Sequence, residues 1–128
     1  MINAAIIGSG IGLKHFEAIN GYRNSKIKII CEKNSKKVKE LKSRYKNIKV
    51  ISNENEIFRS KEINLVSIAS YDDDHFYQIK KCIENNKHII VEKPMCLNLK
   101  QLNQIKMLLK KKPKIKIISN LVLRANSL

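Results

Sequence analysis

Apolar residues in this chain of 128 residues follow two alternating patterns. Six short runs are apolar at nearly every position and rich in β-branched residues, which is typical of strands buried on both faces of a parallel sheet. The predicted strands are residues 2–7, 27–31, 48–51, 65–69, 89–91 and 115–118. Between them, apolar residues recur three and four positions apart, which predicts amphipathic helices. These sets are Val38, Leu41 and Tyr45; Phe76, Ile79 and Ile83; and Leu102, Ile105 and Leu108 or Leu109.

Two further helices complete the alternation of strands and helices. One is predicted to begin near Ile11, and a weaker, shorter one covers residues 53–60. The expected N-caps of the other three helices are Asn34 or Ser35, Asp72 or Asp73, and Asn98. Five strand–helix units closed by a sixth strand predict an α/β fold with a doubly wound parallel sheet in the order 3-2-1-4-5-6. We assign this dinucleotide-binding type of domain to residues 1–120, with its ligand crevice where strands 1 and 4 end.

The composition narrows the class of partner. Lysine and arginine number 26 against 11 aspartates and glutamates, a net charge of +15. Such an excess can indicate a nucleic-acid partner, but the lysines are spread along the chain, arginine is scarce and aromatic residues are few. We therefore expect anionic small molecules rather than nucleic acid. The sequence shows neither an apolar run of membrane-spanning length nor a signal peptide, so we expect no membrane contact and a cytoplasmic location.

The cysteines and the acidic run suggest no metal site. Cys31, Cys82 and Cys96 form no C-x-x-C pair, and we interpret all three as structural thiols. The run Asp72-Asp73-Asp74 lacks ligand-spaced histidines, and helix capping explains it better than a cation does.

A glycine turn after the first strand carries the first functional signal. The stretch "GSGIG" places Gly8, Ser9, Gly10, Ile11 and Gly12 between a strand and a helix, where backbone N–H groups can bind a diphosphate. Gly8 permits the tight turn, Gly10 allows close approach of the diphosphate, and Gly12 serves helix–strand contact. A glycine-rich turn of this kind can also occur in other α/β proteins.

An acidic residue at the end of the second strand strengthens this interpretation. Glu32 lies 20 residues after Gly12, the distance at which a carboxylate meets the ribose hydroxyls of a dinucleotide. A carboxylate there favours NAD over NADP, whereas the neighbouring Lys33 keeps NADP possible. A methyltransferase also uses a glycine loop and an acidic strand end, and it is the nearest structural alternative.

Several stretches together resemble the N-terminal half of the Gfo/Idh/MocA oxidoreductases, the glucose–fructose oxidoreductase and inositol dehydrogenase family. They are "GSGIGLKH", "CEKN", "LVSIASYDDDHFYQIKKCIENNKHIIVEKP" and "NLVLR", in order over nearly the whole chain. The most specific part is Glu92-Lys93-Pro94 after the fifth strand, preceded by His75 at the family's distance. Some members carry the turn G-x-G-x-G-x-x-H, which fits the glycines here and His15.

The resemblance implies reversible hydride transfer between a nicotinamide and a secondary alcohol of a sugar, cyclitol or nucleotide-linked sugar. Lys93 would be the catalytic lysine, Glu92 would place it and the nicotinamide end of the cofactor, and Pro94 would stiffen the turn through a cis bond. Ser70 and Tyr71 stand where many relatives have Thr-Pro, and Tyr71 is expected to pack against the cofactor. His75 completes the cofactor-binding set as a buried or capping side chain, and His15 and His88 are expected to be structural.

The resemblance also bears on domain organisation. Family members continue into a second α/β domain that forms the substrate pocket and most of the oligomer interface. Residues 121–128, with Arg124, match the start of that connection, so we expect an N-terminal fragment of a homo-oligomeric enzyme that binds NAD(H) without turnover. A non-catalytic dinucleotide-binding module, such as a redox sensor or scaffold, stays open. For the enzyme, Glu32 and Lys93 are expected to converge on one crevice above the glycine turn, and side chains that did not converge would overturn this interpretation.

Overall fold

A computed structural model describes residues 1–120 as six strands and five helices in alternation. The strands are β1 (Ile2–Ile7), β2 (Ser25–Cys31), β3 (Lys49–Ile51), β4 (Leu65–Ile68), β5 (His88–Glu92) and β6 (Ile117–Asn120). The helices are α1 (Gly12–Asn20), α2 (Ser35–Arg44), α3 (Asn55–Arg59), α4 (Asp72–Glu84) and α5 (Leu99–Lys111). The expected connection at residues 121–128, including Arg124, lies outside the described residues.

All six strands form one parallel sheet in the order β3-β2-β1-β4-β5-β6. The predicted α/β fold class and strand order are therefore confirmed. At the ends of the central strands, Ile7 of β1 pairs with Cys31 of β2 on one side and with Ile68 of β4 on the other. The chain changes direction across the sheet between β1 and β4, and this change leaves a crevice at their carboxyl ends.

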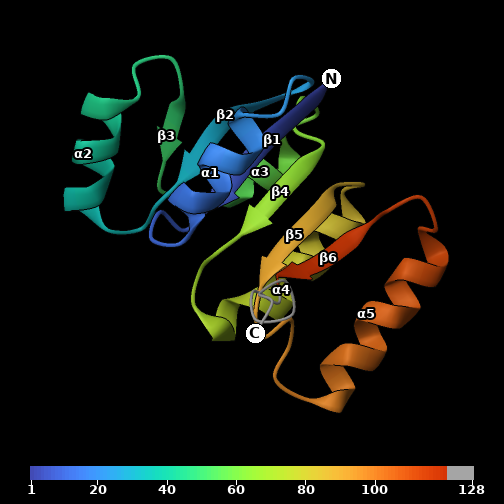
Figure 1. Ribbon diagram of the computed structural model, residues 1–128. Helices are drawn as coiled ribbons and strands as arrows, with labels where there is room; N and C mark the ends of the chain where they lie inside the picture. The colour runs from blue at the N-terminus through green and yellow to red at the C-terminus, as the bar shows by residue number, and fades with distance from the viewer. Residues whose placement is uncertain (121–128) are drawn as a thin grey trace, which may run out of the picture.

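Helices cover both faces of the sheet and bury two apolar clusters. On one face, α1 and α2 cover a cluster that includes Ile6 and Ile30. On the other face, α3, α4 and α5 cover a larger cluster that includes Ile57, Ile79 and Ile105. Figure 1 shows α1 on the viewer's side of the sheet and α4 behind β5 and β6. Burial on both faces explains why the strands are apolar at consecutive positions.

The structure confirms two of the three predicted helix caps. The Asn34 side chain accepts a hydrogen bond from the Lys37 amide at 3.1 Å, and Asn98 accepts one from Gln101 at 2.9 Å. The prediction that Asp72 or Asp73 caps α4 is wrong. Tyr71 is the N-cap, in an extended conformation and without a side-chain hydrogen bond, and all three aspartates lie in the first turn. There the carboxylates face the positive end of the helix dipole.

The last strand begins two residues later than its apolar run predicts. The Ile115 amide donates to the Lys112 carbonyl at 3.0 Å in the turn after α5, so it is not available to a strand ladder. Pairing with β5 starts at Ile117 and continues to Asn120, a polar residue that the apolar pattern excluded. The other predicted strand and helix ends either coincide with the structure, as both ends of β1 do, or differ from it by one or two residues, the usual uncertainty of element boundaries.

Candidate functional site

A pocket of about 180 Å³ opens where β1, β2 and β4 end. Its lining brings together seven of the predicted site residues: Gly8, Ser9, Gly10, Glu32, Lys33, Ser70 and Tyr71. Ile7, Cys31, Lys37, Ala69 and Asp74 complete the lining. The other six predicted residues, which are Ile11, Gly12, His75, Glu92, Lys93 and Pro94, lie outside it.

The first half of the glycine turn passes close to the start of the loop after β4. Gly8 has a φ of +93°, a conformation that side chains rarely adopt, and a Cβ there would lie 2.4 Å from the Ala69 carbonyl oxygen. The Gly8 amide donates to the Cys31 carbonyl at 2.9 Å, which ties the turn to the end of β2. A glycine is therefore required at this position by both the backbone conformation and the close approach of two chain segments.

Gly10 faces open space. A Cβ built on it would meet no atom within 4 Å, although Gly10 lines the pocket. The missing side chain thus leaves open space beside the start of α1. An anionic group can approach the backbone there and accept from N–H donors of the turn, which is the arrangement that a dinucleotide diphosphate needs. On this observation, the residues of the pocket fit a dinucleotide.

Gly12 lies behind the pocket rather than in it. A Cβ at this position would lie 2.6 Å from Cγ2 of Ile6, so the glycine allows α1 to pack closely on β1. This contact is the role that the sequence predicted for Gly12. Ile11 is the N-cap of α1 and is about half exposed, at 47%. Neither side chain lines the pocket, but both belong to the segment that starts the helix.

The Glu32 carboxylate is held in place from two sides. Its Oε2 accepts a hydrogen bond from the Ser9 amide at 3.1 Å and another from the Ser9 hydroxyl, and its Oε1 accepts one from the Asn34 amide at 2.9 Å. Partial burial by itself raises the pKa of Glu32, but these hydrogen bonds outweigh it and lower this pKa below its ordinary value. The carboxylate is therefore ionised at neutral pH and oriented at the end of β2, where it also lines the pocket.

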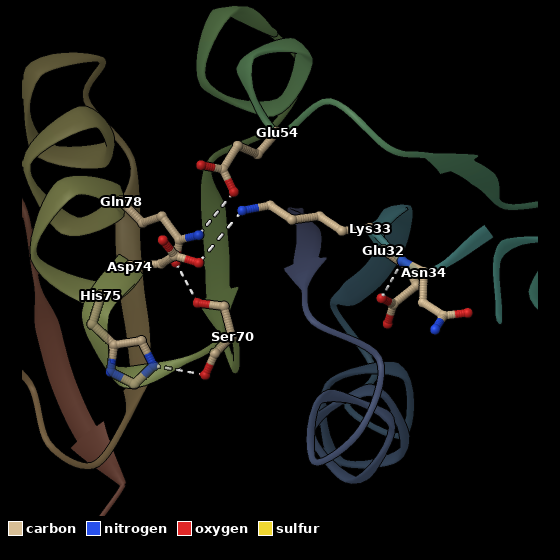
Figure 2. Close-up of polar contacts among 8 residues, drawn as sticks. All are labelled: Glu32, Lys33, Asn34, Glu54, Ser70, Asp74, His75 and Gln78. Carbon is tan, nitrogen blue, oxygen red and sulfur yellow. Dashed lines mark hydrogen bonds and ion pairs between the residues drawn. The ribbon is translucent and has the colours of Figure 1, made fainter. Parts of the chain in front are cut away.

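Lys33 extends across the pocket to the opposite wall. Its ammonium group lies 3.4 Å from Oδ2 of Asp74 in the first turn of α4, and Figure 2 shows this side chain crossing between the two segments. Partial burial opposes the charged form, but the carboxylates of Glu54 and Asp74 raise the pKa of Lys33. An ion pair therefore joins the end of β2 to α4 over the pocket.

A second polar chain supports the loop after β4 (Figure 2). The Ser70 hydroxyl donates to Oε1 of Gln78 at 2.6 Å, and the Gln78 amide donates to Oε2 of Glu54 at 2.8 Å. Gln78 is fully buried, so its amide positions Ser70 from beneath the pocket wall. Tyr71 follows with 84% of its surface exposed, and its ring is accessible to a ligand at the pocket edge.

His75 connects the loops after β4 and β5. It is fully buried, with Nδ1 2.7 Å from the Pro94 carbonyl oxygen and Nε2 3.1 Å from the Ser70 carbonyl oxygen. The predicted buried position of His75 is thus confirmed. Its contacts are with backbone, so His75 holds the shapes of the two loops and does not line the pocket itself.

Glu92 takes part in a polar network on the α1 face of the sheet. Its Oε1 lies 2.6 Å from Nε2 of His15. The same oxygen accepts a hydrogen bond from the side-chain amide of Asn120, also at 2.6 Å. The other His15 nitrogen lies 2.6 Å from the hydroxyl of Ser67, which is fully buried on β4. Burial raises the pKa of Glu92, but the hydrogen bonds from Asn120 and His15 outweigh it and bring this pKa below its ordinary value. Side chains of α1 and β6 therefore hold this carboxylate at the end of β5, and Ser67 of β4 in turn contacts His15.

Lys93 is exposed and follows directly after Glu92, the last residue of β5. The Lys93–Pro94 peptide bond is cis, as the resemblance implied. Because parallel strands end at one edge of the sheet, Lys93 lies on the same edge as the pocket, but it is not part of the lining. The prediction that Glu32 and Lys93 converge on one crevice is therefore wrong for this pocket: Glu32 lines it, and Lys93 lies outside its lining.

Sequence reasoning missed two charged pocket residues and one supporting residue. Lys37 and Asp74 line the pocket, and His15 bonds to Glu92. Lys37 could have been found by one signal only, its position in the first turn of the helix that follows Glu32. The local pattern marks Asp74 only as a capping residue and His15 only as part of the glycine motif. Their partners are distant in sequence, so no local pattern reveals them.

A metal site, a membrane-spanning helix and a reactive cysteine each have structural requirements that can be compared with residues 1–120. Among residues 1–120, no three His, Cys, Asp or Glu side chains are grouped closely enough to hold a metal ion. Across the same residues, no helix has both the length and the apolar character to cross a membrane. The three cysteines, all within this range, are free, and burial raises the pKa of the Cys31 and Cys82 thiols to about 12. Both thiols therefore stay protonated, as expected for structural cysteines.

Residues 2–120 match the sequence model of GFO_IDH_MocA, the oxidoreductase family with an NAD-binding Rossmann fold. The chain belongs to this family. This membership confirms the resemblance found in the sequence, and it extends over every strand and helix described above.

Known proteins similar to this Gfo/Idh/MocA domain are much longer. The chain is 30% identical over 111 residues to the uncharacterized oxidoreductase YdgJ of Escherichia coli, covering 85% of this chain and 31% of that protein. The structure of scyllo-inositol dehydrogenase from Lactobacillus casei with bound NAD(H) and scyllo-inositol matches with a TM-score of 0.87 at 19% identity, over 99% of this chain and 38% of that one. Myo-inositol 2-dehydrogenase from Lactobacillus plantarum matches with a TM-score of 0.86 at 19% identity, over 98% and 38%. The chain thus spans about a third of the length of these relatives.

Proposed function

We propose that the pocket binds the adenosine and diphosphate portion of NAD. The observation that carries the proposal is the open space at Gly10, in the same pocket as the oriented carboxylate of Glu32. In this arrangement the turn N–H groups bind the diphosphate, and Glu32 accepts hydrogen bonds from the ribose hydroxyls. Tyr71 packs against the cofactor from the loop after β4, where its ring is exposed.

The preference for NAD follows from the charge of Glu32. Its lowered pKa keeps a negative charge where the 2′-phosphate of NADP would lie, so that phosphate is repelled while a 2′-hydroxyl is bound. Lys33 lies next to this carboxylate in sequence, but its ammonium group is paired with Asp74 on the opposite wall. NADP binding is therefore expected to be weaker.

We further propose that the whole protein is a dehydrogenase. The cofactor, when bound, supplies the acceptor or donor of a hydride exchanged with a secondary alcohol of a sugar, cyclitol or nucleotide-linked sugar. Lys93 is the proposed catalytic residue, because an exposed ammonium group at the end of a central strand can hydrogen-bond the alcohol oxygen and stabilise its developing charge. Glu92, fixed by His15 and Asn120, positions the backbone from which Lys93 projects.

The substrate pocket is expected in a second α/β domain, as the family resemblance implies. The 128-residue chain should therefore bind NAD(H) without oxidising any alcohol. Steady reduction of NAD by this chain with a sugar would contradict the proposal. The expected homo-oligomeric state and cytoplasmic location of the whole protein stay predictions.

Titration of the chain with NADH tests the binding step. The chain has no tryptophan, so the fluorescence of the reduced nicotinamide can be followed without energy transfer from indole. Gly10→Val should abolish binding, because its side chain enters the space proposed for the diphosphate, where a Cβ meets no protein atom within 4 Å. The melting temperature of the variant should stay close to that of the original chain. NADH binding that survives Gly10→Val would overturn the assignment of this pocket.

A non-catalytic dinucleotide-binding module is the second candidate. It is favoured by one observation, the position of Lys93 outside the pocket lining. Lys93→Ala in the full-length protein separates the candidates. Loss of turnover with unchanged cofactor binding in the variant supports the dehydrogenase. Cofactor binding without turnover in both the original protein and the variant supports the module.

A further inference from the structure

The ion pair over the pocket joins two residues that both line it, Lys33 and Asp74. Lys33 follows Glu32 at the end of β2, so its side chain starts next to the carboxylate proposed to bind the ribose. Its ammonium group nevertheless lies 3.4 Å from Asp74, on the other side of the pocket (Figure 2). The side chain is therefore directed away from the place where a ribose 2′ substituent would lie.

Asp74 is set up to hold Lys33 in this position. Its backbone amide donates to the Tyr71 carbonyl at 3.0 Å, which fixes the first turn of α4. Glu54, whose Oε2 accepts from the buried Gln78, contributes a second negative charge that favours the same position of the ammonium group. Two carboxylates on the α3 and α4 side thus attract Lys33.

We propose that Asp74 is a specificity-determining residue that disfavours cofactors with a 2′-phosphate by keeping Lys33 on the opposite wall. This inference rests on the proposed function, because it assumes that the ribose binds at Glu32. A basic side chain after the acidic residue of β2 is suited to pair with a 2′-phosphate. Held by Asp74, Lys33 does not offset the repulsion between Glu32 and that phosphate. Asp74 therefore adds to the exclusion of NADP that the charge of Glu32 begins.

The test compares the dissociation constants of NADH and NADPH for the chain and for Asp74→Asn. Asparagine keeps the size of the side chain and removes the charge that pairs directly with Lys33. We expect NADPH to bind about fivefold more tightly relative to NADH, the range of one partly exposed ion pair. Asp73→Asn is the matched control, because Asp73 lies one residue earlier in the same turn, carries the same charge and is exposed. In Asp73→Asn, the ratio of the NADPH and NADH dissociation constants should change by less than about twofold.

A double variant separates release of Lys33 from a general charge effect. In Lys33→Met with Asp74→Asn, the gain in NADPH affinity should disappear, because the ammonium group that would pair with the phosphate is absent. The inference is overturned if Asp74→Asn leaves the ratio unchanged, if Asp73→Asn changes it equally, or if the gain persists in the double variant. If the original chain binds neither NADH nor NADPH, the proposed function itself is wrong. Tight NADH binding without a change in the ratio rejects the role of Asp74 alone.

Discussion

Replacing Glu32 by glutamine should destabilise the fold as well as alter the pocket. The carboxylate accepts from the Ser9 amide, the Ser9 hydroxyl and the Asn34 amide, with two different oxygens. Glutamine has one oxygen, so its NH2 group must face one of these donors. The arrangement of lower cost keeps the oxygen on Ser9 and turns the NH2 group toward the exposed Asn34 amide, which water can then satisfy.

The size of the loss follows from this rearrangement. A hydrogen bond to a charged group contributes about 1.5–3 kcal/mol, and solvation of the released Asn34 amide recovers part of it. The remaining bonds to Ser9 also weaken, because the acceptor is no longer charged. We therefore expect the free energy of unfolding to fall by about 1–2 kcal/mol in Glu32→Gln.

Urea unfolding followed by far-ultraviolet circular dichroism at neutral pH measures this loss. Glu62→Gln is the matched control, because Glu62 makes one exposed ion pair with Lys28 at 2.7 Å. Its removal should cost less than about 1 kcal/mol. Equal losses in the two variants, or none in Glu32→Gln, would show that the contacts of Glu32 with Ser9 and Asn34 do not stabilise the fold.

Two further predictions concern the stability of the fold: one tests the buried Lys87, and the other tests the pH dependence that Glu32 and Glu92 produce. Lys87 is buried and donates to the Ser60 and Ile63 carbonyls at 2.6 and 2.9 Å, so Lys87→Met should lower the free energy of unfolding by about 1–3 kcal/mol, measured in urea against the exposed control Lys61→Met. Folding lowers the pKa values of both Glu32 and Glu92 from the ordinary value of 4.5. The stability that these carboxylates contribute is therefore fully present above pH 4.5, and it is lost as the pH falls through their pKa values in the folded state. Urea midpoints measured from about pH 6 to pH 3 should therefore fall, and less steeply in Glu32→Gln.

Local features of the sequence were sufficient to predict the fold and the centre of the pocket. The strands are apolar at consecutive positions because helices cover both faces, and the caps at Asn34 and Asn98 depend on residues only three positions away. The glycine turn was recognisable because Gly8 needs a positive φ and Gly10 an empty side-chain position. The predicted cap of α4 was wrong because three consecutive aspartates are equally suitable capping residues, and the helix in fact begins after Tyr71.

The rest of the candidate site depends on contacts between distant segments. Lys33 and Asp74 are 41 positions apart, and His15 and Glu92 are 77 positions apart. A local pattern cannot show which of several neighbouring acids a lysine side chain reaches. The same reasoning explains why Lys93, recognised by resemblance, could be placed on the correct edge but not located relative to the pocket lining.

The sequence by itself determined the order of strands and helices, the position of the phosphate-binding type of turn and the acidic residue at the end of β2. These properties depend on the periodicity and backbone preferences of short segments. Only the tertiary structure decided that Glu32 is held by Ser9 and Asn34, that Lys33 crosses to Asp74, and that His15 and Asn120 hold Glu92. The physical reason is that strand order and helix packing decide which groups surround a side chain. Partners that are distant in the chain cannot be recognised from the sequence around either of them.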